Sequence, residues 1–169
     1  MKRMKKLLSI VLISILMLTM TVPMETSAAT KLMVHYIDVG QGDAILIQYG
    51  SKNTLIDTGE EKNYSQLKTY LKQISVKKVH NLIVTHPDSD HIGGADYVIR
   101  DYKVSKIYMT KFKSSSNEYK EMIAAIKKYK VDRTNVTTGM KISLGGIKAT
   151  VLHAKDSGTD ANESVSSLN

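Results

Sequence analysis

The segment that most constrains the fold of this chain is a short apolar run followed at once by a polar loop. Leu82-Ile83-Val84 has the composition of a buried strand, and it leads into THPDSDHIGG at 85–94. Two histidines and two aspartates stand close together in that loop. Imidazole nitrogens and carboxylate oxygens bind divalent zinc, manganese or iron, and adjacent carboxylates repel each other unless a cation lies between them. The pattern therefore favours a strand that delivers a metal-binding loop over a polar loop whose aspartates merely cap a helix.

The spacing within the loop indicates two metal positions. His86, Asp88 and Asp90 alternate, so an extended segment would direct all three to one side. His91 is out of step with them, and Gly93-Gly94 would free the backbone to turn into the next helix. Two metals held a few ångströms apart share a hydroxide and stabilise both the attacking and the leaving oxygen. This chemistry suits the hydrolysis of phosphodiesters, lactones or amides.

The remaining sequence alternates between strand and helix patterns, as expected for one α/β domain. A three-strand meander is predicted at 33–39, 44–49 and 54–57, and a helix follows around 67–74. After the strand at 82–85, the patterns predict a helix at 95–102, a strand at 104–109, a helix at 116–129 capped by Ser116 or Asn117, and a late hairpin of 141–144 with 147–152.

Residues 1–29 are predicted to be a signal peptide. A basic start at 1–6 precedes an apolar run at 7–22, and small residues at 26–29 suit a signal peptidase. The alternative is an uncleaved membrane anchor, but the apolar run is shorter than the roughly 20 residues that span a bilayer. We therefore expect a secreted domain at 30–169 with no stable membrane span after cleavage. The chain has no cysteine, which excludes disulfides and a lipid-anchored cysteine.

The chain is basic, with 24 Lys and Arg residues against 16 Asp and Glu residues. Such a charge attracts polyanions, for example DNA or teichoic acid. The lysines are scattered rather than clustered, however, and many domains carry a similar charge for solubility alone. The charge leaves these alternatives open, and the sequence indicates no oligomeric state.

Three stretches resemble a known family. The segment from His86 to His91 resembles the HxHxDH motif of the metallo-β-lactamase superfamily, with Asp88 where a second histidine usually stands, and the HxDxDHxGG form is similar to ComEC-like competence proteins, which take part in DNA uptake. YIDVGQGDA at 36–44 resembles the opening strand and turn of that domain, and TLIDTG at 54–59 resembles its Asp-Thr-Gly motif. The resemblance covers 32–169 and implies an αββα sandwich.

The resemblance also implies roles for individual residues. His86 and Asp88 would bind a first metal, and Asp90 and His91 a second, with Asp90 also acting catalytically by orienting the nucleophilic water. Asp57 would support the metal loop without binding metal. Zinc is the expected metal and manganese the alternative.

Four other residues with metal-binding side chains are not expected to be ligands. Asp43 is interpreted as a turn residue, and His35 and His80 as structural or surface residues. His153 follows the late hairpin and is not expected to bind metal.

The family pattern continues with a Gly-Asp turn and a His-His-Gly-Ser-like segment, and neither occurs here. We therefore expect the N-terminal half of the sandwich only. Two functions remain open. One is an exported metal-dependent hydrolase that cleaves phosphodiester bonds, in DNA or a cell-wall polymer, through a metal-activated hydroxide. The alternative is a non-catalytic, truncated or degenerate member that acts as a binding module.

Overall fold

The computed structural model describes Arg3 and residues 30–154. The expected signal peptide at 1–29 therefore lies, apart from Arg3, outside the described residues, as does the segment 155–169. None of the helices in the described part is long and apolar enough to cross a membrane.

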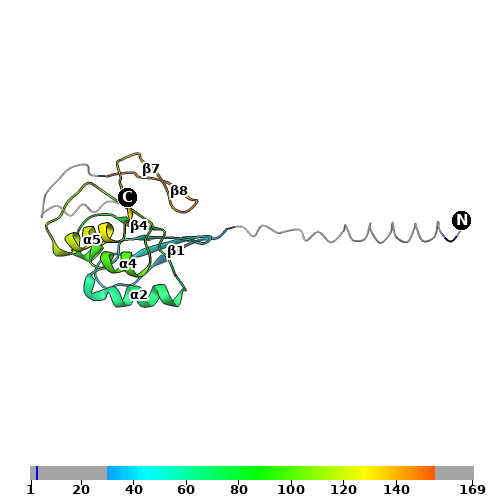
Figure 1. The fold of residues 1–169 in the computed structure, drawn as a ribbon, viewed down its shortest axis with the longest axis horizontal. Coiled ribbons are helices and arrows are strands. Elements are labelled where there is room, and N and C mark those ends of the chain that lie inside the picture. The colour runs from blue at the N-terminus through cyan, green and yellow to red at the C-terminus, as the bar shows by residue number, and fades with distance from the viewer. Residues whose placement is uncertain (1–2, 4–29, 155–169) are drawn as a thin grey trace.

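A six-stranded sheet forms the centre of the fold, in the order β1-β2-β3-β4-β5-β6 (Figure 1). Its strands are β1 (Leu32–Tyr36), β2 (Ile45–Tyr49), β3 (Lys52–Ile56), β4 (Asn81–Val84), β5 (Lys106–Met109) and β6 (Asp132–Asn135). The first three strands pair antiparallel as the predicted meander, and β3, β4, β5 and β6 pair parallel. A separate hairpin is made of β7 (Lys141–Ser143) and β8 (Lys148–Thr150).

Helices connect the parallel strands. They are the 3-10 turn η1 (Glu61–Asn63), α2 (Tyr64–Gln73), α3 (Ser89–Ile92), α4 (Ala95–Asp101) and α5 (Asn117–Lys128). The predicted cap of the last helix is confirmed, because the Ser116 hydroxyl accepts a hydrogen bond from the Tyr119 N–H at 3.1 Å.

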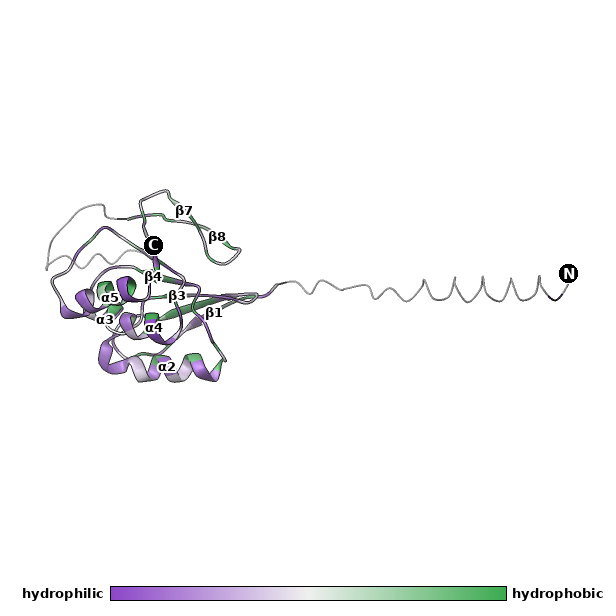
Figure 2. Cartoon of the chain, viewed as in Figure 1, coloured by the Kyte–Doolittle hydropathy of each residue, from purple (hydrophilic) through white to green (hydrophobic). Residues whose placement is uncertain are grey.

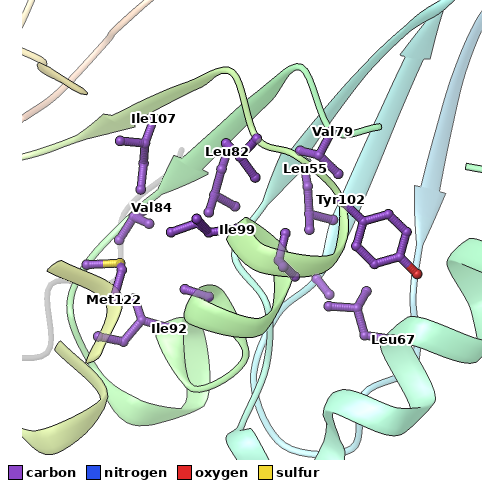
Figure 3. Close-up of a cluster of buried hydrophobic side chains, with 14 of the residues drawn as sticks. Leu55, Leu67, Val79, Leu82, Val84, Ile92, Ile99, Tyr102, Ile107 and Met122 are labelled. Atoms are coloured by element: carbon purple, nitrogen blue, oxygen red, sulfur yellow. The ribbon is translucent and has the colours of Figure 1, made fainter. Parts of the chain in front are cut away.

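One face of the sheet is covered by α2, α4 and α5 (Figure 1). Successive side chains of a strand point to opposite faces, so Leu82 and Val84 of β4 point towards the helices while Ile83 points away. The helices contribute apolar stripes to this core, in which Leu67, Ile99 and Met122 are fully buried (Figure 3). Hydrophilic and hydrophobic residues alternate along the helices, as Figure 2 shows.

The described residues cover the opposite face of the sheet only in part. The β7–β8 hairpin packs over Ile83 and Tyr108. Towards β1 the face is open, and Leu32, Val34 and Tyr36 are 51%, 47% and 80% exposed. The layers in the described residues are therefore helices, sheet and a small hairpin, which confirms the α/β prediction.

Two elements differ from the predictions. The first strand ends at Tyr36 rather than at residue 39, although the Ile37 N–H still donates to the Ala44 carbonyl at 2.9 Å. The strand β6 was not predicted at all, because Asp132, Arg133, Thr134 and Asn135 show no apolar alternation. It is held by pairing with β5, so its structure comes from its neighbour rather than from its own composition.

Candidate metal centre

The predicted metal loop lies where neighbouring parallel strands end. Ile56 of β3 pairs with Ile83 of β4, so Asp57 and the loop that begins at Thr85 leave the sheet at the same edge. The carboxyl ends of parallel strands are the usual place for a binding site in an open sheet. The Thr85 N–H donates to Asp57 Oδ1 at 2.9 Å and so fixes the start of the loop.

The loop turns earlier than the sequence pattern predicted. Asp88 is extended, with φ −80° and ψ 149°, but α3 begins at Ser89, so Asp90 lies on a helical turn. The prediction of one extended segment carrying His86, Asp88 and Asp90 on one side is therefore wrong. The helical turn has a different consequence, because it brings His91 back towards His86.

The four predicted ligands lie together. The rings of His86 and His91 have centroids 3.9 Å apart. His86 Nε2 is 3.4 Å from a carboxylate oxygen of Asp88, and His91 Nε2 is 4.0 Å from one of Asp90. The four side chains thus form a cluster of pairwise contacts in the order Asp88, His86, His91, Asp90. Of the described residues, however, only Asp43, Asp57 and His91 bring three candidate ligand atoms within 4.8 Å of one another.

Two positions near the metal loop, Gly93 and Gly42, leave no room for a side chain. Gly93 has φ −58° and ψ −32°, which any residue adopts, so the predicted role in freeing the backbone to turn is wrong for it. A Cβ on Gly93 would lie 2.3 Å from the Glu61 backbone nitrogen. Gly42 does combine both needs, with φ +97° and a would-be Cβ 1.8 Å from the Asp90 carbonyl oxygen. Without side chains at Gly42 and Gly93, the backbone of these turns packs directly against neighbouring backbone.

Ile92 attaches α3 to the core. It is 1% exposed and points among the buried side chains near Met122 of α5 (Figure 3). The cluster is therefore carried by a helical turn whose apolar residue is fixed, while His91 and Asp90, on the same turn, are partly exposed.

Asp57 determines which ring nitrogen of each neutral histidine carries the proton. Asp57 is 1% exposed, and its carboxylate accepts a hydrogen bond from the Thr85 hydroxyl at 2.5 Å and lies 2.9 Å from His91 Nδ1. A carboxylate only accepts, so neutral His91 must carry its proton on Nδ1. Because the Thr85 hydroxyl donates its single hydrogen to Asp57, it can only accept in its 3.0 Å contact with His86 Nδ1. Neutral His86 must therefore carry its proton on Nδ1 and donate it in this hydrogen bond. Both imidazoles therefore leave Nε2 with a free lone pair.

The protonation of His91 depends on opposing effects. Burial lowers the pKa of His91, but its hydrogen bond to Asp57 and the charges of Asp57, Asp90 and Asp43 outweigh burial, so the pKa is raised overall. A cation at Nε2 would compete with this proton, and metal affinity should fall as the pH decreases.

Asp43 is a member of the cluster that the sequence interpretation left aside. Its carboxylate is 3.9 Å from His91 Nδ1, and atoms of Asp43, Asp57 and His91 lie within 4.8 Å of one another. Asp57 is already engaged by Thr85 and His91, however, so the Nε2 side offers the freer donors. The sequence carries no signal for Asp43, because its place depends on the close approach of Gly42 to the Asp90 carbonyl oxygen.

The other histidines lie in structural or surface positions. His35 contacts the Tyr70 hydroxyl and the Gln48 amide oxygen, each at 3.0 Å. His80 Nδ1 accepts from the Asn53 N–H at 3.2 Å, and burial, with the charge of Lys52, lowers its pKa. His153 is exposed.

The donor set fits a divalent metal. Histidines held at Nδ1 by a carboxylate or hydroxyl, with Nε2 free beside carboxylates, are the arrangement by which proteins orient metal ligands. Two imidazoles and two carboxylates suit zinc and also accept manganese, because both metals bind nitrogen and oxygen donors.

Solved structures share the fold of the described chain. A subclass B3 metallo-β-lactamase, MEM-A1, from a soil metagenome library is similar with a TM-score of 0.53 and 18% identity, over 73% of this chain and 50% of that one. The Rm3 metallo-β-lactamase gives 0.52 and 13%, over 69% and 47%. Rubredoxin oxygen:oxidoreductase from Desulfovibrio gigas gives 0.52 and 23%, over 72% and 32%. The chain thus spans half or less of the length of each of these.

Two curated relatives are similar in sequence over shorter stretches. ComE operon protein 3 of Bacillus subtilis (strain 168) is 32% identical over 111 residues, which are 54% of this chain and 14% of that protein. Recombination protein 2 of Haemophilus influenzae is 30% identical over 97 residues, 54% of this chain and 12% of that protein. The sequence pattern that defines the metallo-β-lactamase superfamily matches residues 37–160, which is more than half of the chain. The chain therefore belongs to the metallo-β-lactamase superfamily.

Proposed function

We propose that the chain is an exported metal-dependent hydrolase that cleaves phosphodiester bonds. The observation that carries this proposal is the cluster of His86, Asp88, Asp90 and His91, in which the neutral rings are protonated at Nδ1 and present Nε2 beside carboxylates. Such a cluster offers nitrogen and oxygen donors to a divalent cation at the edge of the sheet where ligands commonly bind. A cation there would activate water for hydrolysis.

The proposed metal ligands divide into two pairs. His86 with Asp88 would hold one divalent ion, and His91 with Asp90 would hold a second, with zinc expected and manganese the alternative. A bound metal lowers the pKa of water and so supplies a hydroxide nucleophile at neutral pH.

Asp90 and Asp57 would have different roles in the proposed reaction. Asp90 would orient the nucleophilic water by accepting its proton at the carboxylate, which makes it the catalytic residue of the proposal. Asp57 would not touch substrate. Its buried charge keeps Nδ1 protonated on His91 and, through Thr85, on His86, so both rings stay in the ligating orientation.

Charge and relatives support the choice of substrate. The whole chain carries a net charge of +8, and residues 30–169, with 20 Lys and Arg against 15 Asp and Glu, carry +5, which attracts polyanions. Relatives of the ComE operon protein 3 and Recombination protein 2 type, both similar to this chain, favour DNA as the polymer. A cell-wall polymer such as teichoic acid is the second candidate, because the predicted signal peptide would bring the protein outside the cell.

The test begins with metal binding and turnover. The purified chain is titrated with zinc and with manganese by calorimetry, and its hydrolysis of bis(p-nitrophenyl) phosphate is measured with each metal. His86→Ala and Asp90→Asn should each reduce turnover at least about 100-fold, since each removes a ligand or the water-orienting group. His153→Ala, which changes an exposed histidine outside the cluster, is the matched control.

Two outcomes would count against the proposal. Unchanged turnover in His86→Ala would exclude the loop as the source of activity. Stoichiometric metal binding with no turnover would favour the non-catalytic binding module instead.

A further inference from the structure

The loop that follows β5 lies at the same edge of the sheet as the metal loop. Val84 at the end of β4 pairs with Met109 at the end of β5, so the loops that begin at Thr85 and at Thr110 leave neighbouring strands side by side. The two segments also lead into α3 and α5, which pack against each other. Residues 110–116 therefore flank the proposed metal centre.

This loop is basic. Lys111 and Lys113 are both exposed, and Phe112 between them is partly buried. In the described part of the chain neither lysine forms an ion pair, whereas Lys62 pairs with Glu60 at 2.8 Å. Exposed ammonium groups without an acidic partner remain available to an external anion.

The loop has a defined local structure that would hold these lysines in place. The Thr110 hydroxyl accepts from the Phe112 N–H at 3.4 Å, and the Ser114 hydroxyl accepts from the Ser116 N–H at 3.1 Å. Hydroxyls that accept from the N–H two residues later stabilise tight turns. The partly buried Phe112 ring adds an anchor between the two lysines.

The charges of the other loops at this edge explain why the lysines matter. The segment after β3 brings Glu60 and Glu61, of which Glu60 pairs with Lys62, and the metal loop brings Asp88 and Asp90. The loop after β1 adds Asp38 and Asp43, and the segment 136–138 after β6 is uncharged. Without bound metal, a polyanion that approaches this edge would meet mostly like charge. Basic groups beside the centre reduce this repulsion and contact phosphates outside the scissile bond.

We propose that Lys111 and Lys113 bind the backbone phosphates of a polyanionic phosphodiester chain and guide it into the metal centre. This inference rests on the proposed phosphodiester function and names its substrate class. The lysines determine specificity for a polymer over a small phosphodiester, because a small substrate reaches the metal centre without extending along the loop.

The test compares two charge-matched double variants of the full chain. Lys111→Gln with Lys113→Gln removes the proposed contacts. Lys77→Gln with Lys78→Gln removes two equally exposed charges from the segment before β4, at the opposite edge of the sheet. Binding is measured by fluorescence anisotropy over a salt series, with a labelled single-stranded DNA and with poly(glycerol phosphate) of equal phosphate number.

The 111/113 variant should show a smaller slope of log affinity against log salt concentration. For two lost contacts on a single strand the change is about 1.4. The slope of the 77/78 variant should stay at the value of the unchanged chain. A smaller slope with DNA alone identifies nucleic acid, and a smaller slope with both polymers identifies any phosphodiester chain.

The result that overturns the inference is an equal slope in both variants, or no binding of either polymer by the unchanged chain. Cleavage of bis(p-nitrophenyl) phosphate separates this inference from the proposed function. If the small substrate is cleaved while the two variants bind polymers equally, the proposed function stands and the lysines have no such role. If loop-dependent polymer binding is found without cleavage, the proposed function fails and the binding site remains.

Discussion

The two faces of the six-stranded sheet are built very differently. The face under α2, α4 and α5 holds almost all of the fully buried apolar side chains, among them Leu55, Leu82 and Ile107. On the opposite face, the only buried cluster among residues 30–154 is that of Tyr108, Val136 and Ala154, and the strand β1 exposes its apolar residues. The helix-covered face therefore carries the stability of the described fold, and the other face adds little to it.

The metal centre belongs structurally to the stable face. Ile92 ties α3 to the helix-side core, and Asp57 is buried at the end of β3. The positions of the proposed ligands are thus set by the half of the molecule that is well packed. The chain covers about half of the length of the solved metallo-β-lactamases that share its fold.

The largest expected effect tests the contrast between the faces directly. Leu82→Ala should lower the free energy of unfolding by about 2–5 kcal/mol, because it leaves a cavity in a fully buried site. Ile83→Ala, the next residue of the same strand, should cost less than half as much, because Ile83 is only partly buried against the hairpin. Urea unfolding followed by circular dichroism measures both. Equal losses would show that the hairpin face is as tightly packed as the helix face.

The second prediction concerns the support of the metal centre by the stable face. Asp57→Asn should weaken zinc affinity about 10- to 100-fold, because the amide no longer holds the Nδ1 protons of the histidines as a charged acceptor. Calorimetric titration measures the loss. Asp132→Asn, which changes a mostly exposed aspartate on β6, is the control and should leave zinc affinity unchanged. Unchanged affinity in Asp57→Asn would mean that the histidines do not depend on this carboxylate for their orientation.

The sequence predicted the parts of the molecule in which local pattern and tertiary role agree. Val84 belongs to a continuous apolar run that is buried as a strand, and Ser116 caps a helix whose apolar stripe faces the core. The strand at Asp132–Asn135 could not be predicted, because its partner β5 determines it and its own residues are polar. The proposed ligands were predicted from the composition of the loop, and the role proposed for Asp57 comes from the resemblance. The turn at Ser89 and the place of Asp43 depend on close contacts of Gly93 and Gly42 that no local pattern reveals.

The third prediction tests the charge network that fastens α4 to α2 on the helix-covered side. The Arg100 guanidinium lowers the pKa of Asp101, and although burial opposes it, Lys68 and the Tyr64 hydroxyl lower it further. A carboxyl with a depressed pKa in the folded state adds stability above its unfolded pKa of about 3.9. That stability is lost as the pH falls below this value.

Asp101→Asn should therefore lose about 1 kcal/mol of unfolding free energy at pH 7, since a partly exposed pair is screened by solvent. The difference from the unchanged protein should shrink steadily as the pH falls below about 4. Unfolding measured at a series of pH values checks the direction. A difference that stays constant with pH would show that the loss comes from packing rather than from charge.

The smallest effect on stability is expected on the open face. Val34→Thr keeps the shape of a side chain that is 47% exposed on β1, so the free energy of unfolding should change by less than about 0.5 kcal/mol. Its consequence should appear instead in surface properties, because removing an apolar group from an exposed patch reduces binding of the dye ANS. Met33→Thr is the control, since Met33 is 37% exposed on the other side of the same strand. If the dye signal fell equally in both variants, the open face would be no more apolar than the far side of β1, and the contrast between the two faces would rest on packing alone.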